Sequence, residues 1–145
     1  MPVLTLPLSQ DGAAVDVLVG ISYPKAEAMR LANLAIPTPV PIRALIDPGA
    51  SATCVVAGCL QSLSLVSTGT TLMQTPSTGA MPVPCSQYDV SITIVHPSVA
   101  MTLPALAIVE CQPLGGTIQG LIGRDFLSLC LFVYDGAAQR FSLGY

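Results

Sequence analysis

Short apolar runs separated by turn residues follow one another along most of the chain, and this pattern predicts many short strands. The runs that share this character are 3–8, 13–22, 42–47, 86–95 and 101–110. Two further strands are expected within 117–135, around a glycine-bounded turn and a short helical turn at 124–127. This arrangement indicates an all-β, barrel-like domain of short strands, with one or two short helices.

Turn residues mark three expected hairpins. An Asp-Gly pair at 11–12 predicts that the first two runs form a hairpin, and another Asp-Gly pair at 135–136 predicts a hairpin near the C-terminal end. The segment 70–84 carries no charge and has two extended arms around 76–79. We therefore expect a long hairpin there, with a flexible tip.

One segment favours a longer helix. Ser22 can cap a helix over 22–36 that has Pro24 in its first turn, and the proline-rich stretch 37–41 then ends it. The apolar run at 53–66 fits a strand or a helix equally well.

Composition narrows the class of protein. The chain has 145 residues, of which 52% are hydrophobic and 9% charged, so residues 1–145 suit a single domain with one core and not a disordered chain. The net charge is −3, and the five Lys and Arg residues are scattered along the chain. This distribution argues against a nucleic-acid partner.

Signals for export, membrane insertion and metal binding are weak in this sequence. The N-terminal segment lacks a positive region and a cleavage site, and the uncharged stretch 55–75 is too polar for a membrane-spanning helix. Five irregularly spaced Cys residues favour buried thiols in a reducing compartment, and the single His96 argues against a zinc site. By default we expect a cytoplasmic protein without a metal or cofactor.

One carboxylate is unusual in its position. Asp47 lies within “RALIDPGAS” at the end of an apolar run, and no charged residue follows it from Pro48 through Tyr88. A carboxylate behind a buried strand is costly unless it is paired, hydrogen-bonded or protonated, which makes Asp47 a candidate functional group. Because Asp-Pro-Gly is also a good β-turn sequence, a purely structural role is the alternative.

A second motif lies far downstream, in “GLIGRDFL” at 120–127. Together, “LIDPGA” and “LIGR” resemble the two motifs of the retropepsin-like aspartic protease family, in the same order and at a similar spacing. The resemblance covers 13–21 and 40–145 and leaves 22–39 as a helical or loop insertion. It implies a closed acid-protease-like barrel with a flap hairpin at 70–84, assembled as a symmetric dimer.

In this family each chain supplies one aspartate, so the resemblance implies a homodimer with Asp47 of each protomer at its centre. Two carboxylates held close together share one proton. The ionised carboxylate takes a proton from a water molecule, while the protonated one polarises the peptide carbonyl. The implied function is an aspartic endopeptidase that cuts extended peptide or protein substrates without a cofactor.

The resemblance also assigns roles to residues near Asp47. Gly49, Ala50 and Ser51 would line the cleft, and the hairpin tip at 78–79 would close over substrate. The two tip residues are Thr78 and Gly79.

Supporting residues come from the second motif. Arg124 would hydrogen-bond Ser51 or a backbone carbonyl, since viral members of the family carry Asp in place of Ser51. Alternatively, Arg124 and Asp125 form a solvated turn pair. The other supporting residues are Leu121, Ile122 and Gly123, and the expected apolar cleft walls are Ile42, Leu45, Val55 and Ile122.

Pro48 is the main departure from the family pattern. A Thr or Ser hydroxyl usually occupies this place and hydrogen-bonds across the dimer, whereas Pro has neither a hydroxyl nor an N–H. Two alternatives to a protease therefore stay open. One is a weak or inactive module of the same fold that binds extended peptides or mediates dimerisation. The other is an unrelated β-barrel in which Asp47 only begins a turn.

Overall fold

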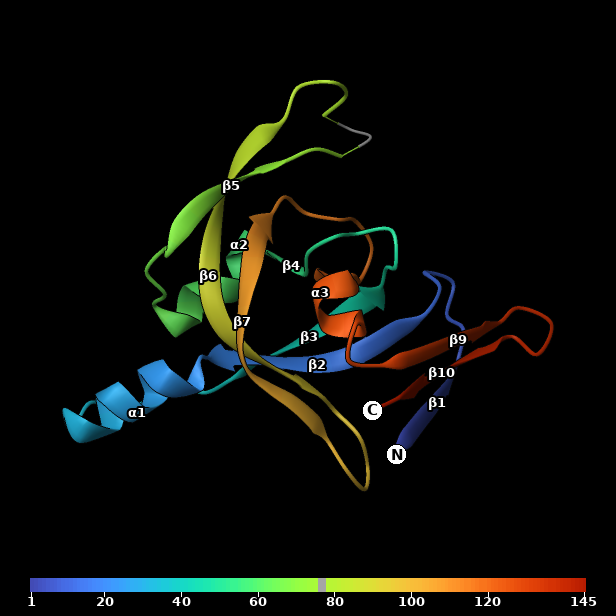
Figure 1. Cartoon of the computed structure of the whole chain (residues 1–145), viewed down its shortest axis with the longest axis horizontal. Helices are drawn as coiled ribbons and strands as arrows, with labels where there is room; N and C mark the ends of the chain where they lie inside the picture. The colour runs from blue at the N-terminus through green and yellow to red at the C-terminus, as the bar shows by residue number, and fades with distance from the viewer. Residues whose placement is uncertain (76–77) are drawn as a thin grey trace.

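A computed structural model describes residues 1–75 and 78–145, and within them the chain is built mainly from strands (Figure 1). The strands are β1 (Val3–Pro7), β2 (Ala14–Ile21), β3 (Val40–Ile46), β4 (Cys54–Val56), β5 (Gly69–Met73), β6 (Val83–Ile94), β7 (Met101–Cys111), β8 (Gly120–Ile122), β9 (Leu131–Asp135) and β10 (Arg140–Gly144). The helices are α1 (Tyr23–Leu31), α2 (Ala57–Leu60), the 3₁₀ turn η1 (Gln61–Leu63) and α3 (Arg124–Leu127).

Six strands close into a barrel in the order β2-β3-β8-β4-β7-β6, because β2 pairs with both β3 and β6. The pairs β3–β8 and β4–β7 are parallel, and the long β6–β7 hairpin is antiparallel. Its register shifts between Val90 and Ile92, and such a bulge bends a strand and increases its twist. The predicted all-β fold with a closed barrel and few short helices is confirmed.

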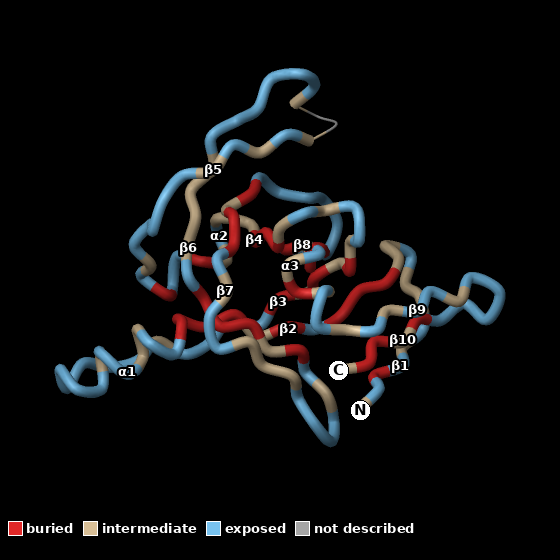
Figure 2. Tube along the Cα trace, viewed as in Figure 1, coloured by how far each residue is buried: buried red, intermediate tan, exposed pale blue. Residues whose placement is uncertain are grey.

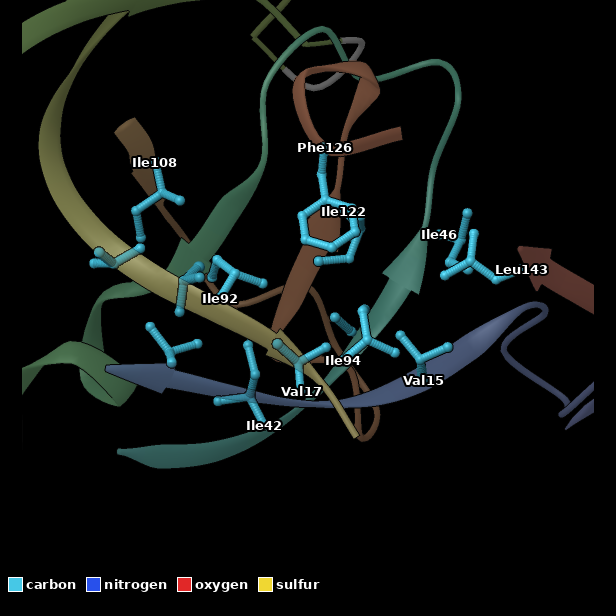
Figure 3. Close-up of a cluster of buried hydrophobic side chains, with 14 of the residues drawn as sticks. Val15, Val17, Ile42, Ile46, Ile92, Ile94, Ile108, Ile122, Phe126 and Leu143 are labelled. Carbon is cyan, nitrogen blue, oxygen red and sulfur yellow. The ribbon is translucent and has the colours of Figure 1, made fainter. Parts of the chain in front are cut away.

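Branched side chains from alternate strand positions fill the barrel. Figure 3 shows Val17, Ile92 and Ile94 in this cluster, together with Ile122 of β8 and the ring of Phe126 from α3. Phe126 is completely buried, and burial of a side chain of this size contributes about 1.5–3 kcal/mol. Its burial fixes α3, and with it the residues of the second motif, against the end of the barrel.

β5 extends the barrel sheet beyond β6, and the other three strands form a separate antiparallel sheet in the order β1-β10-β9. Leu4, Phe141 and Leu143 are buried on its inner face, while Val3 and Val133 are exposed on the outer face. The predicted hairpin between 3–8 and 13–22 is therefore wrong. The chain does turn at Ser9–Gly12, but both edges of β2 are occupied by barrel strands, so β1 pairs with β10.

The predicted helix at 22–36 exists, but it ends at Leu31. Ser22 occupies the N-cap position without a side-chain hydrogen bond, and Pro24 lies in the first turn. No residue of α1 is buried (Figure 2). Ala26 and Met29 are partly buried and pack against the core. The helix lies inside the segment 22–39 that the sequence predicts as an insertion.

The other local predictions also have clear outcomes. The ambiguous run 53–66 contains β4, α2 and η1, so it is both strand and helix. β9 and β10 form the predicted hairpin around 135–136, and β5 pairs with the first part of β6 as the arms of the 70–84 hairpin. Residues 76–77 at its tip lie outside the described residues. None of the helices in the described ranges is long and apolar enough to cross a membrane.

Candidate active site

Asp47 follows β3 directly, and its backbone N–H donates to the carbonyl of Ile122 (3.0 Å). The next residues form a tight turn that the Ala50 N–H closes on the Asp47 carbonyl (3.1 Å). Within this turn the Gly49 N–H donates to Oδ1 of the Asp47 carboxylate (2.9 Å). A Cβ on Gly49 would lie 3.0 Å from that oxygen, so the absence of a side chain permits this close approach. The turn thus orients one carboxylate oxygen and leaves Oδ2 for other partners.

The Asp47 turn interlocks with the segment that follows β8. The parallel β3–β8 register places Ile46 opposite Ile122, which brings Gly123 beside the turn. The Arg124 N–H donates to the Ala50 carbonyl (2.9 Å). The Asp47 turn and the second motif therefore form one hydrogen-bonded unit, although Pro48 and Arg124 are 76 positions apart in the sequence.

The guanidinium of Arg124 supports the turn from the other side. Its Nη1 donates to the carbonyls of Pro48 (3.0 Å) and Gly49 (3.2 Å). Of the two partners expected from the sequence, Ser51 or a backbone carbonyl, the structure has the carbonyls. Arg124 therefore braces the backbone of the turn that contains Asp47.

A second carboxylate, that of Asp125, stabilises the site in a way that the sequence does not predict. Asp125 Oδ1 accepts the Thr53 hydroxyl (2.7 Å) and the Phe126 N–H (2.8 Å), and Oδ2 accepts the Thr53 N–H (2.8 Å). The Thr53 hydroxyl in turn accepts the Gly123 N–H (3.1 Å). The alternative that Asp125 is a solvated turn residue is therefore wrong. An Asp placed just after Gly-Arg was the available signal, but no pattern in the sequence pairs it with Thr53.

We expect Thr53→Val to lower the free energy of unfolding by about 1–3 kcal/mol, since Thr53 is fully buried and the change leaves the Gly123 N–H without its acceptor. Thr70→Val, on the exposed part of β5, is the matched control and should change it by less than about 0.5 kcal/mol. Urea unfolding of the two variants provides the comparison. Equal effects would show that the Thr53 hydroxyl is not a structural link.

An open cleft of about 640 Å³ lies above Asp47. Residues 49–52 form its floor with Asp47, and residues 71–75 of β5 and its extension form the opposite side. Val109, Leu114 and Leu121 supply apolar surface. Within the described part of the chain, Asp47 is the one charged residue that lines this cleft. An uncharged, partly apolar cleft with a single carboxylate suits a neutral, extended ligand.

The structure brings some of the predicted site residues together and separates others. Gly49, Ala50, Ser51 and Leu121 line the cleft with Asp47. The predicted walls are wrong: Ile42, Val55 and Ile122 are buried inside the barrel, and Leu45 does not line the cleft.

Thr78 and Gly79 lie in the β5–β6 turn, outside the cleft lining. The Thr78 hydroxyl donates to the Thr75 carbonyl (2.9 Å) and accepts the Thr75 N–H (2.9 Å). Gly79 has a φ of +62°, which favours glycine, and its carbonyl accepts the Gln74 side chain (3.0 Å). These contacts hold the described part of the tip together. Among the described residues, no three His, Cys, Asp or Glu side chains gather in a metal-binding arrangement.

Comparisons with known proteins bear on the fold. No family model and no curated protein matches the sequence. A retropepsin-like aspartic protease from Rickettsia conorii is similar in structure, with a TM-score of 0.53 and 16% identity over 99% of this chain and 91% of that one. An aspartic proteinase from Irpex lacteus has a TM-score of 0.59 and 12% identity over 99% of this chain and 47% of that one. The chain therefore has the aspartic protease fold, and the alternative of a β-barrel of another fold is wrong.

Proposed function

We propose that this protein is an aspartic endopeptidase of the retropepsin type. The observation that carries the proposal is the placement of Asp47. It lies on the floor of a cleft whose other described lining residues are uncharged, in a turn held by the second motif. Oδ1 is fixed by the Gly49 N–H, and Oδ2 is available to a water molecule or substrate. A carboxylate placed in this way on the aspartic protease fold suits proton transfer to and from a bound water.

The chemistry requires two such carboxylates, and one chain supplies a single Asp47. Two Asp47 residues, one from each protomer, would share one proton. The ionised member takes a proton from water, whose oxygen attacks the scissile carbonyl carbon. The protonated member hydrogen-bonds the carbonyl oxygen, and a proton passes to the leaving nitrogen as the C–N bond breaks. Because the pair must retain its one shared proton, cleavage should be fastest at acidic to near-neutral pH.

Two features support assembly as a homodimer. The chain spans about half of the Irpex lacteus proteinase, so two copies provide a comparable amount of structure. The outer face of the β1-β10-β9 sheet exposes Val3 (52%) on β1 and Leu131 (56%) and Val133 (48%) on β9, the two strands that flank β10. A symmetric contact through this face would bury apolar side chains that a single chain leaves in water.

The cleft also favours a class of substrate. β5 is the last strand of its sheet, so an extended peptide can hydrogen-bond along its free edge. Val109, Leu114 and Leu121 favour apolar side chains next to the scissile bond, and the lack of charge beyond Asp47 disfavours charged ones. We therefore propose extended, largely uncharged segments of peptides or proteins as substrates.

The direct test is cleavage of an unstructured protein between pH 4 and 7 over a series of enzyme concentrations, with and without pepstatin, an inhibitor of paired-aspartate proteases. Because the proposed site needs two chains, activity per chain should rise with concentration and level off once dimers predominate. Pepstatin should abolish the cleavage. The contrary result would be an activity per chain that stays constant as the enzyme concentration rises from well below micromolar. It would contradict a site shared between two weakly associated chains.

A second candidate function is a module of the same fold that binds extended peptides without cutting them. Pro48 favours this candidate, since it places no hydroxyl beneath Asp47. Peptide binding that is unaffected by the loss of the carboxylate, with no cleavage under any condition above, would favour the binding module.

We expect Pro48→Thr to strengthen the dimer. The new hydroxyl can form one bond in each direction across the symmetry axis, and two bonds of about 0.5–1.5 kcal/mol each correspond to roughly 5- to 150-fold tighter association. Sedimentation equilibrium measures this constant. Pro97→Thr, in the exposed β6–β7 turn, controls for the removal of a proline and should leave association unchanged. Association that is equal in both variants would remove the argument that Pro48 weakens the dimer.

A further inference from the structure

Two buried cysteines lie side by side beneath the cleft. Cys54 begins β4 and Cys111 ends β7, and both thiols are free. The two strands are parallel, with Cys54 opposite Val109 and Val56 opposite Cys111. Side chains alternate along a strand, so Cys54 and Val56 share a face with Val109 and Cys111. The thiols are therefore diagonal neighbours on one face of the barrel wall.

This face is packed separately from the barrel interior. Cys54 (4% exposed), Val109 and Cys111 (8% exposed) form a small cluster of their own, with Leu121 and Met73 packed against it. Cys54 also lines the cleft that contains Asp47, whereas Cys111 does not. A water-sized reagent in the cleft thus has a route to Cys54, and Cys111 is the thiol directly behind it.

The two thiols are electrostatically unequal. The interaction between them lowers the pKa of Cys54 and raises the pKa of Cys111 far above its usual value. Burial and the charges of Asp47 and Asp125 oppose the shift at Cys54 but do not reverse it. Cys54 lines the cleft and has the lowered pKa, so it is the thiol that meets a reagent from the cleft as a nucleophile, and Cys111 is the second thiol of the pair.

We propose that Cys54 and Cys111 form an oxidation site that takes hydrogen peroxide, or a small hydroperoxide, from the cleft and closes to a disulfide. The Cys54 thiolate attacks one peroxide oxygen, the O–O bond breaks, and the leaving hydroxide takes up a proton to give water and a sulfenic acid at Cys54. The Cys111 sulfur then attacks the Cys54 sulfur. The S–O bond breaks, and the hydroxide leaves as water with the Cys111 proton. Two electrons pass from the two thiols to the peroxide.

The position of the pair connects oxidation to the candidate active site. Cys54 lies next to Thr53, which holds Asp125 and the Gly123 N–H. A disulfide would fix β4 to the end of β7, from which the chain continues to Leu114 at the cleft wall. Any resulting change in peptide cleavage rests on the proposed function, whereas formation of the disulfide does not.

The test is oxidation of the full chain by hydrogen peroxide, followed by alkylation of the remaining thiols and mapping of unreduced peptides by mass spectrometry. The expected product is a Cys54–Cys111 linked peptide that has lost two hydrogen atoms and that dithiothreitol restores. In Cys111→Ser the sulfenic acid should persist at Cys54 and be captured by dimedone. These readouts do not depend on protease activity, so they stand even if the chain cuts no peptide.

Cys85 provides the sharpest control, because it packs against the same cluster from β6. The Cys85→Ser variant should form the Cys54–Cys111 disulfide as readily as the chain without a substitution. A link from Cys111 mainly to Cys85 would overturn the proposal. Oxidation spread evenly over all five thiols would overturn it as well. So would irreversible oxidation of Cys54, without a disulfide, in the chain that carries no substitution.

Discussion

Replacement of Asp47 by Asn should reduce peptide cleavage by about 10³-fold or more, since the amide can neither take a proton from water nor share one with its symmetry mate. The fold should survive, because an Asn oxygen can still accept the Gly49 N–H that now bonds Oδ1. We expect the free energy of unfolding to change by less than about 1 kcal/mol. Cleavage assays and urea unfolding of the same preparation separate the two effects.

The matched control is Asp89→Asn, which makes the same chemical change on the exposed side of β6, away from the cleft lining. It should leave both cleavage and unfolding unchanged. Cleavage retained by Asp47→Asn would exclude Asp47 as the catalytic group. Loss of cleavage in both variants would point to an effect of net charge and not to the chemistry of the cleft.

Most of the fold could be predicted because its determinants are local. Most barrel strands are apolar runs with turn residues at their ends, and that pattern is visible in the sequence; β4, which leads directly into α2, is the exception. The pairing of β1 could not be predicted in this way. Its Asp-Gly turn does form, but the partner of β1 is decided by β2, whose two edges are already used in closing the barrel. Strand pairing thus depends on the whole sheet and not on the turn.

The candidate site also has parts that local motifs predict and parts that depend on the whole fold. Asp47 and “LIGR” are short motifs, so they could be recognised one at a time. The cleft walls were assigned incorrectly because neighbouring residues of one strand face opposite ways: Leu121 lines the cleft, while Ile122 is buried in the barrel. Both are aliphatic, and only the register of β8 distinguishes them. The Thr53–Asp125 bond joins residues 72 positions apart and has no local signal at all.

Gly123 illustrates how strongly the two motifs depend on each other, and its replacement by Ala should have the largest effect on stability. A Cβ at this position would lie 2.5 Å from the Ala52 carbonyl carbon, 2.6 Å from its oxygen and 2.9 Å from the Thr53 nitrogen. All three are backbone atoms, which cannot move aside as a side chain can. The backbone at Gly123 is extended, with φ −87° and ψ −177°, so its need for glycine comes from this close approach and not from its dihedral angles.

We therefore expect Gly123→Ala to lower the free energy of unfolding by about 3 kcal/mol or more, because the methyl group must separate the Asp47 turn from the segment after β8. Gly58→Ala is the matched control. Gly58 lies in α2, where a Cβ would meet no atom within 4 Å, so this change should be neutral or stabilise the protein by up to about 1 kcal/mol. Urea unfolding compares the two variants, and recovery of soluble protein reports on Gly123→Ala if it no longer folds. A Gly123→Ala protein as stable as the Gly58→Ala protein would mean that the two motifs can separate freely, and the turn that holds Asp47 would then need another source of rigidity.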